Sequence, residues 1–235
     1  ESTAANFVPG DSNQSADVFL QDRETGQTIL VSVGDRRRQG NKASGNPRLS
    51  GDGRFVAFES LANNLVGGDA NGASDVFVRD LLCGRTELAS VDPSGRQVQF
   101  ASTIGGISFD GRFVGFFTRS PLLALDGNGI EDYYVRDRLL GRTFLVSATL
   151  VFDRVPQAPN GLSRNGAISG DGLFFVFESL ASNLSRLDPN TRPDIYRAFV
   201  PAVQQGPFPA SNHVLLNLDG AIRQFDLAGR ATGRA

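Results

Sequence analysis

The residues best suited to chemistry lie in a phrase that occurs four times, Asp-x-Asn-x-x-x-Asp followed by two strand-favouring residues. The phrase is present at 11–19, 69–77, 126–134 and 188–196. Carboxylate and amide oxygens gathered by a tight loop are hard ligands, which suit Ca²⁺ better than zinc or copper. Asp and Asn are also favoured turn formers, because their side chains cap nearby backbone N–H groups. The phrase therefore predicts either a weak calcium site or a structural turn.

The third copy concentrates the most negative charge and is the best calcium candidate. Compared with calcium loops of the form D-x-[DN]-x-[DN]-G, the phrase is shorter before its last acid and lacks the bidentate Glu. We expect such a cation to bind weakly, at roughly 0.1–1 mM, and to stiffen the loop. Arg192 and two prolines argue against a cation in the fourth copy. The candidate ligands are Asp126, Asn128, Glu131 and Asp132 in the third copy, Asp69, Asn71 and Asp75 in the second, and Asp11, Asn13 and Asp17 in the first.

A single basic cluster, Arg36, Arg37 and Arg38 followed by Lys42, is a candidate site for an acidic ligand. Guanidinium groups form strong, paired hydrogen bonds with carboxylates and phosphates. The alternative is an ordinary solvated loop. We expect this cluster in the connection from the outer strand of one blade of the propeller predicted here to the inner strand of the next blade, on the same face as the Asp-x-Asn loops.

Catalytic chemistry has few residues to draw on. The chain has one His, His213, and one Cys, Cys83, and it contains no G-x-S-x-G or phosphate-cradling motif. A polysaccharide hydrolase or lyase could instead use paired carboxylates, with Asp69, Asp126 and Asp188 as the obvious candidates. Equivalent residues in every repeat argue against this alternative, because catalysis breaks symmetry whereas folding reproduces it.

The spacing of the phrase predicts the architecture. Its copies begin at residues 11, 69, 126 and 188, which are 58, 57 and 62 residues apart, and such a period indicates a repeat protein. In the second copy, 54–60, 75–80 and 86–91 alternate as strands do, and Asp52-Gly53 is a hairpin turn signal. With the segment before this turn, each repeat has four short strands joined by tight turns, which favours antiparallel pairing. The sequence predicts an all-β propeller with four-stranded antiparallel blades.

The segment from Ser50 to Asp80 resembles the TolB-like, WD-type β-propeller repeats of bacterial secreted and envelope proteins. It reads S-x-D-G-R-F-V-A-F-x-S, then a loop, then G-D-x-N-G-x-x-D-V-F-V-R-D, and it recurs in weaker form at 108–137, 169–197 and 1–22. The resemblance implies a periplasmic or extracellular bacterial setting. It also implies a central channel able to hold a peptide or an ion. Such propellers host many unrelated roles, so the motif is specific for the fold rather than for the function.

We expect one propeller domain over 1–235, with repeats at about 1–42, 43–99, 100–160 and 161–235. The first repeat contains only its second half, and 213–218 with 221–227 read as a hairpin able to complete it. That pairing would close a four-bladed ring. The alternatives are an excerpt of a larger propeller or edges that pair between chains.

Composition narrows the partners. The formal net charge is −2 with 20% charged residues, which favours neither nucleic acid nor an anionic membrane, and no apolar run is long enough to span a bilayer. The chain has no Met, so we expect it to be a piece of a longer product, and one Cys excludes an intrachain disulfide.

These features predict a non-catalytic, secreted or cell-surface binding or scaffold module that recognises a protein or a glycan through its loop face. Calcium at the Asp-x-Asn loops is the only cofactor expected. The alternatives are the carbohydrate-acting enzyme above and an architectural, self-associating part of a larger envelope protein. The oligomeric state and the ligand are open at this point.

Overall fold

The structure, a computed structural model, describes residues 1–148, 157–185, 192–198, 213–218, 221–226 and 231–234. The described part is built of short strands and one 3₁₀ turn, η1. It contains no helix long and apolar enough to cross a membrane. The strands and η1 have these bounds: β1 Phe19–Gln21, β2 Thr28–Leu30, η1 Asp35–Arg37, β3 Ser44–Leu49, β4 Phe55–Ser60, β5 Asp75–Asp80, β6 Arg85–Leu88, β7 Ser102–Ile107, β8 Phe113–Thr118, β9 Asp132–Asp137, β10 Arg142–Leu145, β11 Ser163–Ile168, β12 Phe175–Ser179, β13 Asp194–Ala198, β14 His213–Leu218, β15 Ala221–Asp226 and β16 Ala231–Arg234.

Two four-stranded antiparallel sheets form the centre of the molecule. Strands β3 to β6 pair in chain order, and so do β7 to β10. The turn that joins β3 to β4 shows how the sequence sets this pairing. Ser50 Oγ donates to Asp52 Oδ1 at 2.5 Å, and Gly53 has φ +72°, a left-handed conformation that glycine adopts without strain. The same Ser-x-Asp-Gly arrangement returns at 108–111 and 169–172.

The sheets stack face to face, so the core lies between them. On β5, Val76 and Val78 face one neighbouring sheet and Phe77 faces the other, because side chains alternate across a strand. Every residue of β5 is buried in consequence. The next interface contains Tyr133 of β9 packed on Phe177 of β12. The chain is thus an all-β protein of four-stranded antiparallel propeller blades, as predicted from the period.

Turns of neighbouring sheets are also joined directly. The amide of Asp52 donates to the carbonyl of Phe109 at 3.0 Å, and the amide of Phe109 donates to the carbonyl of Gly170 at 2.9 Å. On the inner strands, Glu59 Oε1 accepts from the Ile104 amide at 2.8 Å. The β3–β6 sheet is therefore fixed to the β7–β10 sheet, and this sheet to β11–β13, by hydrogen bonds as well as by the core.

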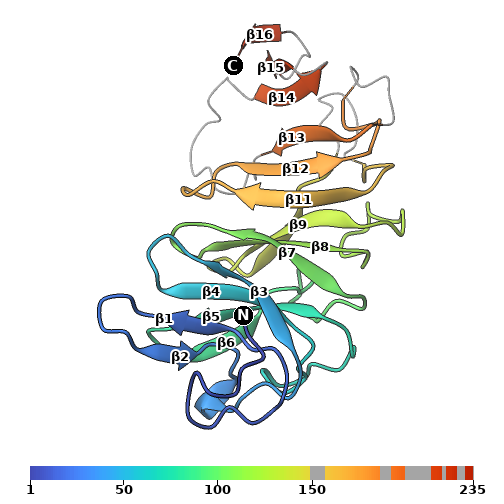
Figure 1. Cartoon of the computed structure of the whole chain (residues 1–235). Coiled ribbons are helices and arrows are strands. Elements are labelled where there is room, and N and C mark those ends of the chain that lie inside the picture. Colours follow the sequence, from blue (N-terminus) through green and yellow to red (C-terminus); the bar gives the residue numbers. More distant parts are fainter. Residues whose placement is uncertain (149–156, 186–191, 199–212, 219–220, 227–230, 235) are drawn as a thin grey trace.

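The two ends of the described chain differ from the expected closure. Strands β1 and β2 form a two-stranded sheet, which the Ser2–Asp17 bridge extends. The predicted hairpin forms, because β14 pairs with β15, and β16 pairs with the other edge of β15, so neither edge of β15 is left for the first repeat. Figure 1 shows the sheets following one another from β1–β2 at one end to β14–β16 at the other. The number of blades and the way a ring would close stay predictions.

Candidate functional site

The second Asp-x-Asn loop is held by a network of hydrogen bonds around Asp75, a buried residue at the start of β5. Ser90 Oγ donates to Asp75 Oδ1 at 2.7 Å, and Asn71 Nδ2 donates to Oδ2 at 2.9 Å. Gln97 Nε2 donates both to Asp75 Oδ2 at 2.8 Å and to Asp69 Oδ1 at 2.6 Å. One amide nitrogen therefore lies between the two carboxylates of the motif, where a cation would otherwise be expected.

The remaining groups of this loop are used in the same way. Asn71 Oδ1 accepts from the Ala73 amide at 2.8 Å, which is an Asx turn. Burial raises the pKa of Asp75, while hydrogen bonds from Ser90, Gln97 and Asn71 act to lower it. The geometry in this copy is that of the structural turn.

The first copy repeats the network with its own residues. Gln39 Nε2 donates to Asp11 Oδ1 at 2.7 Å and to Asp17 Oδ2 at 2.8 Å. Ser32 Oγ donates to Asp17 Oδ1 at 2.5 Å, and Asn13 Nδ2 donates to the Gly40 carbonyl at 2.8 Å. A cation would have to displace the glutamine amide, so these two copies fit Ca²⁺ poorly. Sequence reasoning missed both glutamines, although Gln39 and Gln97 are 58 residues apart, as the aspartates are.

The third copy lacks this glutamine. Asn183 Nδ2 donates to the Ala158 carbonyl at 3.0 Å, just as Asn64 Nδ2 donates to the Gln39 carbonyl at 2.9 Å. Ala158 therefore stands where the first two copies have glutamine. An alanine side chain has no donor, so the bridge between the two carboxylates of the motif is missing here.

The two carboxylates of the third copy are partnered differently in consequence. The Tyr134 hydroxyl donates to Asp126, while Asn128 Nδ2 and Ser147 Oγ donate to Asp132 at 2.8 and 3.1 Å. Both aspartates are buried. Burial raises the pKa of Asp132 to about 7, and the nearby Asp126 carboxylate acts in the same direction. This loop can therefore hold a proton near neutral pH.

The other predicted ligands do not complete a metal cage. Glu131 supplies its main-chain oxygen to the Ser163 amide at 3.0 Å, and burial raises the pKa of its carboxyl group. Across the described ranges, no three His, Cys, Asp or Glu side chains are gathered as a metal group. Asp188 lies outside the described residues, as does most of the fourth loop.

The basic cluster forms the connection between β2 and β3. Arg36, Arg37 and Arg38 are exposed, and the first two have φ +57° and +59°. The Gly34 amide donates to the Arg38 carbonyl at 2.8 Å, which closes the loop. In the next repeat, the matching loop is closed by the Asp92 amide, which donates to the Arg96 carbonyl at 2.8 Å. Gly95, with φ +83°, takes the place of Arg37 in that loop. Arg37 thus adopts a conformation for which the sister loop uses glycine.

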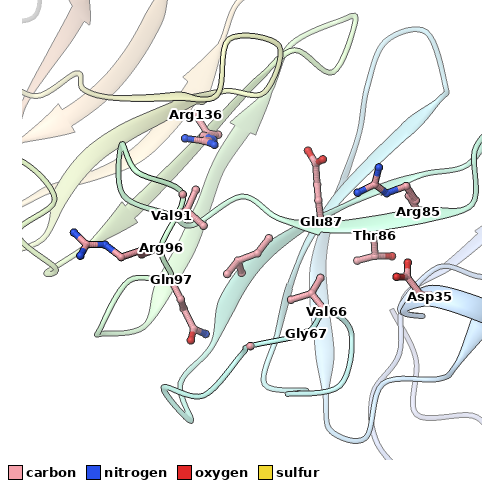
Figure 2. A pocket seen from close by; sticks show the side chains of 13 residues that line it. Asp35, Val66, Gly67, Arg85, Thr86, Glu87, Val91, Arg96, Gln97 and Arg136 are labelled. Carbon is pink, nitrogen blue, oxygen red and sulfur yellow. The ribbon is translucent and has the colours of Figure 1, made fainter.

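An open hollow of about 600 Å³ lies beside this connection, along β6. Figure 2 shows its charged side chains: Asp35 from η1, Arg85 and Glu87 from β6, Arg96 from the loop after β6 and Arg136 from β9. The apolar part comes from Val66, Leu88 and Val91. The hollow joins three consecutive repeats, and sequence reasoning did not find it because its residues come from four separate segments.

Asp80 and Asp137, at the ends of β5 and β9, have structural roles. Asp80 accepts from Arg54 at 2.7 Å and from the amides of Leu82 and Cys83, so it caps the following turn. Asp137 does the same with Arg112 at 2.7 Å. Cys83 is a free, exposed thiol. The backbone of His213 lies in β14.

No family model and no curated protein sequence matches this chain. Solved structures with a similar backbone include TolB from Acinetobacter baumannii, at 16% identity over 92% of this chain and 47% of that chain, with a TM-score of 0.45. A prolyl endopeptidase structure is 15% identical over 92% of this chain and 32% of that chain, with a TM-score of 0.47. The β-propeller domain of the Trilobed protease from Pyrococcus furiosus is 11% identical over 77% of this chain and 56% of that chain, with a TM-score of 0.37. This chain spans less than half of the first two proteins, and the likeness concerns the fold alone.

Proposed function

We propose that the chain is a non-catalytic binding module of the TolB-like propeller type that acts outside the bacterial cytoplasm. Its ligand is an anionic protein or glycan, held at the connection Gly34–Arg38. Three adjacent, exposed guanidinium groups support this ligand class, since arginine binds carboxylates, sulfates and phosphates through paired hydrogen bonds.

The observation that carries the proposal is the backbone of Arg37. A residue with a Cβ atom is disfavoured by roughly 1–2 kcal/mol in the left-handed region, and the sister loop avoids this cost with Gly95. Strain of this kind persists where the surrounding structure or a function maintains it. A solvated loop without a role has no reason to keep arginine at this position.

Binding of anionic polymers tests the proposal. We expect heparin or polygalacturonate to bind the wild-type chain, with an affinity that falls as salt is raised. The triple variant Arg36→Gln, Arg37→Gln, Arg38→Gln is expected to lose this binding. The matched control replaces Arg23, Arg48 and Arg142, which are exposed elsewhere, by glutamine and removes the same charge. Equal loss in both triple variants, or no binding by the wild type, would refute the proposal.

A weak calcium site in the third loop is a second candidate role. The observation that favours it is the missing glutamine, since Asp126 and Asp132 are two buried carboxylates that no amide of the described residues bridges. Asp126 and Asp132 would share the cation with backbone or water oxygens. We expect Ca²⁺ at about 5–10 mM, above the range of such loops, to raise the melting temperature of the wild type but not of an Asp126→Ala, Asp132→Ala variant. An unchanged wild-type melting temperature would remove this candidate.

The enzyme and self-association alternatives stay predictions. Release of reducing ends from acidic polysaccharides would support a hydrolase or lyase. Light scattering after size exclusion would report association between chains, which open sheet edges invite.

A further inference from the structure

Strand β6 has a free edge. It is the last strand of its sheet and pairs only with β5 among the described strands. The Ala89 amide donates to the Val76 carbonyl at 2.8 Å, and hydrogen-bonded positions alternate along an antiparallel pair. Thr86 and Leu88 therefore turn their backbone N–H and C=O groups away from β5. Within the described residues, these groups have no backbone hydrogen-bond partner.

The hollow lies along this edge. Its lining includes four consecutive residues of β6, Arg85 to Leu88, whose side chains alternate between the two faces of the sheet. In Figure 2, Glu87 and Thr86 point to opposite sides of the strand. A hollow that touches both sets must run along the outer edge rather than over one face. The hollow therefore borders the edge that carries the unused backbone groups.

Arginine side chains flank the edge. Arg136 is partly buried and donates to Thr143 Oγ1 at 3.2 Å, and burial lowers its pKa. Its counterpart Arg79 is more deeply buried and has two acceptors, Thr86 Oγ1 at 3.1 Å and the Gly34 carbonyl at 3.4 Å. Arg136 thus retains donors that a ligand can use. Arg85, exposed at the start of β6, has no ion pair among the described residues either.

The acidic groups around the hollow are mostly engaged. Glu87 pairs with Arg138, and Asp92 pairs with Arg96 at 3.0 Å. Asp35 is the remaining carboxylate of the lining. Among the described residues, the lining therefore has two guanidinium groups without an ion pair, those of Arg85 and Arg136, and one carboxylate without an ion pair, that of Asp35. The excess positive charge favours an anionic ligand group.

We infer that β6 binds an extended peptide that adds to the sheet as a strand and places an acidic side chain between Arg85 and Arg136. Backbone hydrogen bonds to Thr86 and Leu88 would supply affinity, and the arginines would select the side chain. This inference rests on the proposed function only in that the chain is a binding module. It names a second surface, separate from Gly34–Arg38, and a partner class.

An array of immobilised heptapeptides, varied at alternate positions and carrying Glu, Gln or Lys at the centre, tests the inference. We expect the Glu series to bind best. The strongest Glu peptide, labelled with fluorescein, should bind Arg136→Gln and Arg85→Gln at least about tenfold more weakly by anisotropy, as for the loss of a charged hydrogen bond. Arg142→Gln, at the same place in the next blade, should bind as the wild type does.

Hydrogen exchange of the β6 backbone amides gives a second measurement, because added peptide would not change their exchange rates if the arginines had only a structural role. Bound peptide should slow the exchange of the Thr86 and Leu88 amides and leave Thr143 and Leu145 of β10 unchanged. No preference for Glu, or protection elsewhere, overturns the inference. Retained binding of heparin or polygalacturonate at Gly34–Arg38 in that case would leave the proposed function standing, whereas loss of that binding alone would refute only the proposed function.

Discussion

Replacing Gln97 by Ala should remove from the second loop the donor that the third loop lacks. Gln97 Nε2 makes two hydrogen bonds to carboxylates, and its Oε1 accepts from the Ala70 amide at 2.9 Å. Asp69 is partly exposed and can exchange its lost bond for water, but Asp75 is buried. A hydrogen bond to a charged group contributes about 1.5–3 kcal/mol. We expect the free energy of unfolding to fall by about 2–4 kcal/mol, which lowers the melting temperature by roughly 5–12 °C for a chain of this size.

Urea unfolding followed by circular dichroism measures this change, at about pH 8 and about pH 5. The loss should be larger at the higher pH, because burial raises the pKa of Asp75 and loss of the Gln97 hydrogen bond raises it further, so the carboxyl group takes up a proton more readily as the pH falls. Gln27→Ala, in an exposed turn, is the matched control. A loss below about 0.5 kcal/mol at both pH values, within the usual range of surface changes, would show that the glutamine does not hold the carboxylates together.

Three further predictions concern the third repeat and the arginine connection. Between about pH 4 and pH 7 the native chain keeps a proton on Asp132 that the unfolded chain releases, so the free energy of unfolding should fall as pH rises through this window. Asp132→Asn should abolish this fall and Ala158→Gln should reduce it. Denaturant unfolding at a series of pH values measures both effects. Arg37→Gly should raise the free energy of unfolding by about 0.5–1 kcal/mol, because relief of left-handed strain exceeds the entropy cost of glycine. The same substitution should weaken anion binding. A variant that is both more stable and a tighter anion binder would contradict the role given to Arg37. Gly105→Ala should lower it by about 1–3 kcal/mol, since its Cβ would lie 2.4 Å from the buried Tyr133 ring, whereas Gly127→Ala, with open space around it, should have little effect in the same thermal scans.

The architecture could be predicted from the sequence because the repeat states the same local rules several times. The Asp-Gly turns, the alternating strands such as 55–60 and the period near 58 agree with one another, and each is decided by neighbours in sequence. The two predictions for the Asp-x-Asn phrase, a calcium site or a structural turn, also rest on local chemistry. The structure favours the turn in the first two copies, through Asn13 and Asn71.

The sites could not be predicted in the same way, because their partners lie far apart along the chain. Gln39 meets Asp11 across 28 residues. The hollow combines segments from Asp35 to Arg136, which no local pattern relates. Ring closure could not be decided from the sequence for a similar reason: 221–226 has the pattern of a completing strand, but that pattern does not distinguish the first repeat from β14 and β16 as its partners.

Departures from the repeat are therefore more informative about function than the repeat itself. In the third copy, Ala158 removes the donor between Asp126 and Asp132, and Tyr134, which stands where the second copy has Phe77, returns a donor to Asp126 alone. The pair of changes leaves Asp132 with the raised pKa instead of restoring the network. A change that only relaxed the fold would have no reason to bring a hydroxyl to one carboxylate and leave the other to hold a proton. Arg37 departs in the same sense, because it keeps a charge where the fold would be better served by glycine.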